Sequence, residues 1–148
     1  MTIYFYAQTD EFSEFSNFAP YGVEMDGEWW RTVEHYFQAQ KFQNPDYQAR
    51  IRKCSRPKDA SAMGRTRDIP LRPDWETAKD DIMYRAVLKK FETHPEIRQL
   101  LLSTGAQDIV ENAPMDPYWG CGADGTGLNK LGKILMRVRQ ELRSPEQV

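Results

Sequence analysis

The chain has 148 residues, of which 40% are hydrophobic and 12% aromatic, so it can bury the core of about one domain. Its 20 Lys and Arg residues and 22 Asp and Glu residues give a formal charge of -2, and its pI is about 5.7. This nearly balanced charge argues against non-specific electrostatic binding to nucleic acid but allows a local basic pocket. The sequence lacks an apolar run that would span a membrane, and its N-terminus lacks the features of a secretory signal. We therefore expect a cytoplasmic protein with a single domain over residues 1–148.

Metal-binding residue types are scarce in the sequence. Cys54 and Cys121 form no C-x-x-C pair, and the chain has only two histidines. Zinc sites in proteins draw on clusters of these two residue types. The sequence therefore predicts a protein that works without a metal ion.

The first thirty residues predict a small N-terminal β region. Residues 2–7 are rich in Tyr, Phe and Ile, which is typical of a strand. Residues 23–25 and 28–30 flank Asp26-Gly27, the strongest short hairpin signal.

From residue 32 onward, capping residues, prolines and glycines predict a series of helices. Thr32 is suited to cap the first of them. The predicted helices cover residues 33–42 and 45–53, a third that starts at 55–57 and stops at Gly64, and a fourth that is capped by Asp74 and runs to about Phe91. A fifth helix starts at 93–95 and is ended by Gly105, a short strand covers 108–111, and the last helix begins near Asn129. The expected fold class is α+β, a helix-rich single domain with a small sheet.

The first predicted helix carries a polar stripe. Glu34, Gln38 and Lys41 lie at positions i, i+4 and i+7 and so share one face. Glu34 and Lys41 are about 10 Å apart along the axis, which is too far for an ordinary ion pair but allows both to reach a ligand between them. The alternative is a solvated polar face. The aromatic residues in the same short segment favour a site.

A glycine-rich loop over 116–129 precedes the last helix, with four glycines in eight residues. Such a loop can present backbone N–H groups to a phosphate at a helix N-terminus. It lacks the G-K-[ST] of a Walker A motif. The alternative is an ordinary flexible loop. Trp119 offers a flat surface on which a base or sugar can stack, or it is a half-buried core aromatic.

Two shorter segments leave two interpretations open. Phe15-Ser16-Asn17-Phe18 forms either a turn with its own side-chain-to-backbone bonds or a pocket wall for a hydroxyl-rich ligand. Arg65 and Arg67 follow a predicted helix end, where they either complement the helix dipole or bind a phosphate.

These segments, in this order, resemble the NADAR or YbiA-like N-glycosidase family over roughly residues 3–142. The most specific blocks are E-H-Y-F-Q-A-Q-K-F at 34–42 and W-G-x-G followed by G-L-N-K-L-G at 119–132. Further matching pieces are F-S-N-F at 15–18, A-M-G-R at 62–65, R-P-D-W at 72–75, K-K-F at 89–91, L-L-S-T-G at 101–105 and I-V-E-N at 109–112.

The resemblance implies a helix-rich α+β fold and a cofactor-free hydrolase of N-glycosidic bonds. The small-molecule substrates implied are ribosylamino-pyrimidine phosphates, reactive intermediates of riboflavin biosynthesis, which the enzyme would remove as damage control. A related branch removes ADP-ribose from guanine bases, so nucleic acid would enter only as a modified substrate. A third hypothesis is a non-catalytic module that binds ADP-ribose or another nucleotide sugar.

The resemblance also implies a functional lysine at the position of Lys41. We expect Lys41 to be the nucleophile and Glu34 the general acid and base, with Asp116 assisting or holding ribose hydroxyls. A lysine attacks only when neutral, so burial or cationic neighbours must lower its pKa. Arg65 and the glycine loop are the phosphate candidates. The expected substrate-binding residues are Asn17, Phe18, Arg65, Trp119, Gly120 and Asn129.

Overall fold

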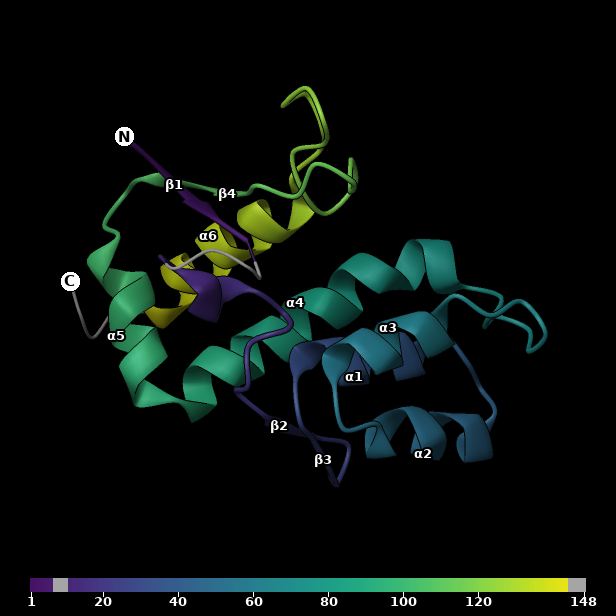
Figure 1. Cartoon of the computed structure of the whole chain (residues 1–148). Coiled ribbons are helices and arrows are strands. Elements are labelled where there is room, and N and C mark those ends of the chain that lie inside the picture. Colours follow the sequence, from purple (N-terminus) through teal and green to yellow (C-terminus); the bar gives the residue numbers. More distant parts are fainter. Residues whose placement is uncertain (7–10, 144–148) are drawn as a thin grey trace. The chain divides into compact units, whose positions relative to one another are not determined.

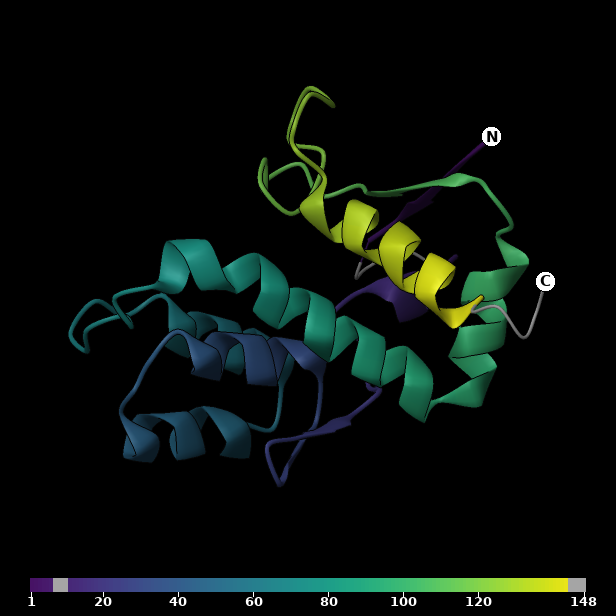
Figure 2. The same cartoon turned by 180° about the vertical axis from the view of Figure 1, so that it is seen from behind.

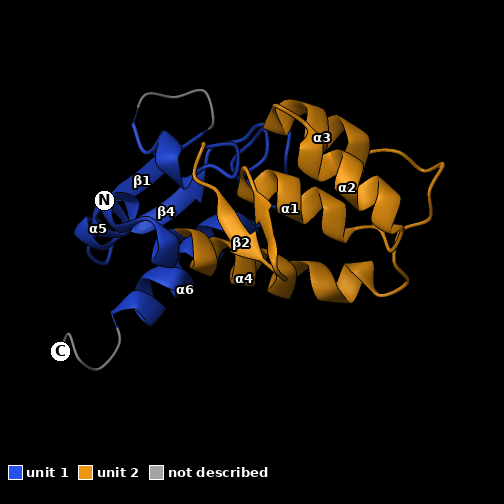
Figure 3. Ribbon diagram, turned by 90° about the horizontal axis from the view of Figure 1, so that it is seen from below, with its two compact units in different colours: residues 1–19, 91–148 blue, residues 20–90 orange. Residues whose placement is uncertain are grey.

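A computed structural model describes residues 1–6 and 11–143, and these residues form two compact units (Figure 3). Unit 1 combines residues 1–19 with the chain from Phe91 onward, and unit 2 is Pro20–Lys90. The boundary falls within helix α4 (Trp75–Thr93), whose course is seen from behind in Figure 2. The prediction of a single domain over 1–148 stays a prediction.

Unit 1 is built on a two-stranded parallel sheet. Strand β1 (Thr2–Phe5) pairs with β4 (Asp108–Glu111), with Ile3 opposite Ile109 (Figure 1). Helix α6 (Lys130–Leu142) packs on β4 and contacts α5 (Pro95–Ser103).

An aromatic cluster fills the core of unit 1. The ring of Phe15, which ends the short 3-10 helix Ser13–Phe15, meets Phe5 and Phe91 edge-on with centroids 5.9 Å apart in both cases. All three rings are buried, as are Leu131, Leu135 and Val138 on one face of α6. Apolar residues at this helical spacing are expected on a face that packs against a sheet.

Unit 2 consists of a hairpin followed by three short helices and most of α4. Strands β2 (Val23–Met25) and β3 (Glu28–Trp30) are antiparallel. Both turn residues, Asp26 and Gly27, have positive φ (56° and 83°), the backbone that a tight two-residue hairpin turn needs. Three helices then pack against one another: α1 (Val33–Gln40), α2 (Pro45–Lys53) and α3 (Pro57–Gly64).

The helix-rich α+β class and every predicted helix are confirmed, with two differences at helix α1 and strand β1. The helix predicted over 33–42 ends at Gln40, because the N–H groups of Lys41 and Phe42 bond to carbonyls three residues back and tighten the last turn. The strand predicted over 2–7 is Thr2–Phe5 in the structure, and Ala7 lies outside the described residues.

The predicted N-terminal β region divides between the units. Strand β1 belongs to unit 1 and pairs with a strand about a hundred residues later in the chain, whereas the hairpin belongs to unit 2. In the part of the chain that the structure describes, no helix combines the length and apolar character needed to cross a membrane.

Candidate functional site

The start of helix α1 is held by a closed set of hydrogen bonds. Thr32 Oγ1 accepts the His35 N–H at 3.1 Å as the N-cap, and it lies 2.8 Å from His35 Nδ1. The other ring nitrogen, Nε2, lies 3.0 Å from the carbonyl oxygen of Cys54. A carbonyl only accepts, so Nε2 carries the proton and Nδ1 accepts from the threonine hydroxyl. This bonding, together with full burial, makes His35 a structural residue.

The cap places Glu34 in the first helical turn, where its side chain is 7% exposed. Gln38, one turn further and 8% exposed, donates from Nε2 to Glu34 Oε2 at 2.8 Å. A hydrogen bond from an amide favours the ionised carboxylate. The predicted polar stripe is therefore a buried, bonded pair rather than a solvated face.

Lys41 follows the last residue of α1 in the tightened turn. Its Nζ donates to the carbonyl oxygen of Gly64, the last residue of α3, at 3.3 Å. Burial lowers the pKa of the Lys41 ammonium, and the charge of Glu34 opposes this shift. The cations Arg67, Arg65 and Lys79 lower the pKa further. The lowered pKa makes the Lys41 ammonium easier to deprotonate, as the predicted role of a lysine nucleophile requires.

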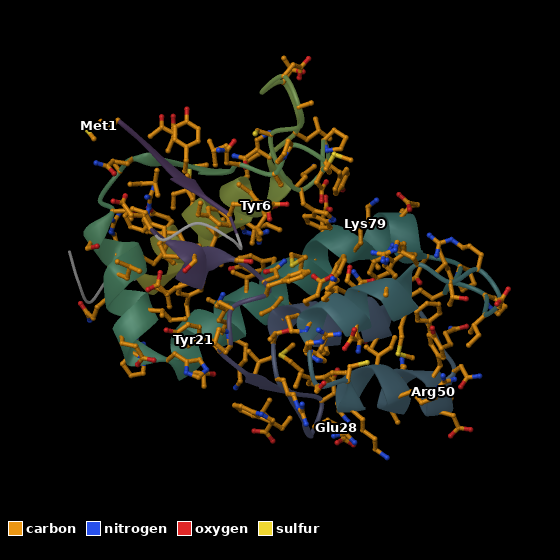
Figure 4. All side chains as sticks on the ribbon, in the orientation of Figure 1. Met1, Tyr6, Tyr21, Glu28, Arg50 and Lys79 are labelled. Carbon is orange, nitrogen blue, oxygen red and sulfur yellow. The ribbon has the colours of Figure 1, made fainter. Side chains whose placement is uncertain are left out.

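The cations around Lys41 come from two further segments of unit 2. Arg67 Nη1 donates to the carbonyls of Gly64 (3.3 Å) and Thr66 (2.7 Å). Arg65 is exposed, with Nη1 3.4 Å from Ser61 Oγ. Lys79 extends from α4 (Figure 4), where its Nζ lies 2.7 Å from Glu76 Oε1. Positive charge gathered beside a carboxylate and an amine suits an anionic substrate.

The remaining predicted site residues belong to unit 1. Asp116 Oδ1 accepts the N–H groups of Tyr118 (3.0 Å) and Trp119 (2.9 Å), which shapes the start of the glycine loop. The ring of Trp119 is half-buried and meets Tyr118 edge-on at a centroid distance of 4.9 Å.

The glycine loop uses its backbone N–H groups internally where it joins helix α6. The N–H groups of Asn129, Lys130 and Leu131 donate to carbonyls of Gly120, Tyr118 and Trp119 at 2.9–3.0 Å. Gly120 is buried, and its own N–H donates to the carbonyl of Asp116. These bonds take up N–H groups that the sequence suggested for phosphate, so the loop's visible role is to anchor α6.

Asn129 ties the start of α6 to strand β4. Its Oδ1 accepts from the Glu111 N–H at 3.0 Å and its Nδ2 donates to the Ile109 carbonyl at 2.9 Å. Asn17 is buried, and Phe18, 37% exposed, donates its N–H to Ser16 Oγ at 3.0 Å. That bond is the turn that the sequence allowed for 15–18.

Unit 2 thus brings together Glu34, Lys41 and Arg65 from the predicted set. It adds Arg67, which the sequence offered only as an alternative phosphate contact, and Gln38, which the sequence placed on the same helical face. The sequence around Lys79 does not indicate a place in the site, because only the packing of α4 brings Lys79 near Lys41. Within the described ranges 1–6 and 11–143, no group of three or more His, Cys, Asp or Glu side chains is arranged to hold a metal.

The chain has a helix-rich α+β fold, and helix α1 carries the buried carboxylate of Glu34 and is followed by Lys41, whose pKa is lowered. A chain with these features matches a known domain. Residues 4–143 match the NADAR domain, and the chain belongs to the NADAR family. It is 50% identical to an N-glycosidase of Nostoc punctiforme, covering 97% of this chain and 94% of the relative.

Two further relatives extend the comparison. N-glycosidase YbiA of Escherichia coli is 47% identical, with 95% of this chain and 88% of the relative covered. The NMR structure of E. coli YbiA superposes with a TM-score of 0.90 and 46% identity over 98% of this chain and 86% of that chain. The maize riboflavin biosynthesis protein PYRR, chloroplastic, is 44% identical over 95% of this chain, which spans 25% of that longer protein.

Proposed function

We propose that this protein is an N-glycosidase that hydrolyses the bond between C1′ and nitrogen in ribosylamino-pyrimidine phosphates of riboflavin biosynthesis. Relatives named as N-glycosidases support the reaction class, and a relative named as a riboflavin biosynthesis protein supports the substrate. The activity removes reactive intermediates. The protein acts in the cytoplasm, a reducing compartment in which its two free cysteines stay as thiols.

The observation that carries the proposal is the setting of Lys41. A lysine nucleophile needs a neutral amine, and at an ordinary pKa of about 10.4 almost none is neutral at pH 7. Burial and three neighbouring cations lower the pKa of Lys41. An amine in this setting beside a buried carboxylate is the pair of groups that a covalent glycosyl transfer uses.

The reaction then runs in two halves. The ribosylamine opens to an imine at C1′, and the Lys41 ammonium gives a proton to the Glu34 carboxylate. Neutral Lys41 then attacks C1′, and the pyrimidine amine leaves with the proton supplied by Glu34. This leaves the sugar joined to Lys41 as a Schiff base. Glu34, now ionised, takes a proton from the water that attacks C1′, and the sugar phosphate leaves as Lys41 recovers its amine.

The phosphate of the substrate is held by Arg65 and Arg67, the exposed cations of the cluster. Arginine presents several donors to phosphate oxygens in a fixed plane. Asp116, Asn17, Phe18, Trp119, Gly120 and Asn129 stay predicted contributors from unit 1. We also expect turnover to survive dialysis against a chelator, and loss of activity restored by a divalent metal would contradict this.

The test is a hydrolysis panel with wild type and Lys41→Arg. The substrates are a ribosylaminopyrimidine phosphate, ADP-ribosyl-guanosine and NAD. Arginine keeps the positive charge but does not serve as this nucleophile. We expect wild type to cleave the first substrate and to retain the sugar after borohydride reduction, as a mass increase on Lys41, and we expect the variant to do neither.

Each alternative has its own outcome in this panel. Preferred cleavage of ADP-ribosyl-guanosine assigns the protein to nucleic-acid repair, and binding without cleavage of any substrate makes it a sensor. Near-normal activity in Lys41→Arg excludes the covalent step and leaves Glu34 with a water as the catalyst.

A further inference from the structure

Gln38 has one buried polar atom with a partner and one without. Its Nε2 donates to Glu34 Oε2 at 2.8 Å. Its Oε1 is buried, and no hydrogen-bond donor among the described residues reaches it. Buried polar atoms in folded proteins are nearly always paired, so an exception in a candidate site calls for a reason.

The reason lies in the carboxylate. An ionised carboxylate only accepts hydrogen bonds, so the amide must turn its nitrogen toward Glu34. Turning the nitrogen this way directs the oxygen toward the α-carbon of Gly64. A β-carbon on residue 64 would overlap Gln38 Oε1 and lie 2.7 Å from its Cδ. The glycine at the end of α3 therefore makes room for the amide in this orientation.

The same amide can serve the other protonation state of Glu34. When Glu34 is protonated, a half-turn of the amide brings Oε1 to the carboxyl, and the carboxyl O–H then donates to it. An amide thus offers a donor to the charged form and an acceptor to the neutral form. A group that gives up and takes back a proton in each turnover uses both.

We propose that Gln38 is a positioning residue that sets the pH at which Glu34 works as an acid and base, and that Gly64 is required for it. The inference rests on the role proposed for Glu34. The charged group coupled to Glu34 is Lys41, which follows the same helix, and Lys41 is in turn acted on by Arg65 and Arg67 after α3 and by Lys79 of α4. The neighbouring elements α2 and β3 contribute Arg52, paired with Glu28 at 3.6 Å.

The first test replaces Gln38 by methionine, which has a similar length but no donor. Loss of the N–H removes stabilisation from the ionised carboxylate, so the acid limb of kcat/KM moves to higher pH by about one unit. The matched control is Gln40→Met, on the same helix and half-buried, which leaves the limb in place. A purely structural role for Gln38 lowers kcat at every pH without moving the limb.

The second variant leaves Gln38 in the chain. In Gly64→Ala the new β-carbon pushes the flexible amide away from Glu34 while alanine favours the helix, so the fold is retained. It moves the acid limb in the same direction as Gln38→Met. An unmoved limb in both folded variants overturns the proposal.

A direct titration separates this inference from the proposed function. Carbon-13 NMR of protein labelled at the glutamate carboxyls follows Glu34 in wild type, Gln38→Met and Gly64→Ala, with no substrate present. An upward shift of the Glu34 midpoint in both variants supports the inference even if the substrate panel gives no cleavage. Identical midpoints in all three proteins overturn it even if the panel succeeds.

Discussion

Lys41 and Arg67 donate to one acceptor: Lys41 Nζ and Arg67 Nη1 each lie 3.3 Å from the carbonyl oxygen of Gly64. The shared carbonyl holds two cations close together at the end of α3. Their repulsion favours the neutral form of the lysine, because the guanidinium stays protonated. Gly64 thereby helps to set the chemistry of Lys41 through its backbone alone.

Removing the Arg67 charge is therefore expected to raise the pKa of Lys41. In Arg67→Gln the basic limb of kcat/KM, at which the Lys41 ammonium loses its proton, moves to higher pH. Activity at pH 7 falls severalfold, because Lys41 gives up its proton less readily. The measurement is a pH–rate profile from pH 6 to 10. Arg85→Gln is the matched control, since Arg85 is an exposed arginine of α4 paired with Asp81. A limb that stays in place in Arg67→Gln would show that Arg67 has no electrostatic effect on Lys41.

Acid should destabilise the fold through His35. Burial lowers its pKa below the usual 6.5, opposed by the hydrogen bond to the Cys54 carbonyl. Below pH 6.5 the unfolded state takes up a proton that the folded state resists, so the free energy of unfolding falls with pH by up to about 1.4 kcal/mol per unit. The stability is fully present above pH 6.5 and is lost toward the lower pKa of the folded state.

Urea unfolding at several pH values between 7.5 and 5 measures this slope. The carboxyls whose pKa is lowered by hydrogen bonding, Asp59, Asp74 and Asp124, titrate below 3.8 and do not interfere. His35→Gln should lose the slope that His94→Gln retains. Equal slopes in both variants would contradict the role assigned to His35.

Local signals predicted the elements of this fold and much of its site. Thr32, Pro57 and Gly64 mark helix ends that the structure confirms, and Asp26-Gly27 marks the hairpin. The helical period alone put Glu34, Gln38 and Lys41 on one face. Each of these inferences depends only on residues close together in the chain.

Contacts between distant segments escaped the same reasoning. The pairing of β1 with β4 joins segments about a hundred residues apart in the chain, and strand propensity does not identify the partner strand. Counting glycines in 120–127 could not reveal that nearby carbonyls take up the N–H groups at the start of α6. The cation Lys79 acts on Lys41 only because α4 carries it there.

Asn129 is expected to be a strong stability determinant of unit 1. Its amide satisfies the Glu111 N–H and the Ile109 carbonyl, and its backbone has φ of 53°, which asparagine tolerates better than alanine. Asn129→Ala should lower the free energy of unfolding by about 2–4 kcal/mol, since it leaves two backbone groups unpaired. Denaturant unfolding with Asn112→Ala as the exposed control measures the difference. A cost below that of the control would mean that the amide bonds contribute little.

Two glycines of the loop, Gly127 and Gly125, allow close backbone packing to be tested separately from the need for a positive φ. At Gly127 a β-carbon would lie 2.6 Å from the carbonyl carbon of Cys121 and from the Gly120 oxygen, both backbone atoms that cannot turn aside. Gly127→Ala should therefore cost about 3 kcal/mol or more. At Gly125 a β-carbon meets nothing within 4 Å, and only the positive φ of 83° opposes it, so Gly125→Ala should cost about 1–2 kcal/mol. The two variants are compared by denaturant unfolding. Equal costs would mean that the loop relaxes around residue 127 and that its glycines serve backbone conformation rather than the close approach of its two ends.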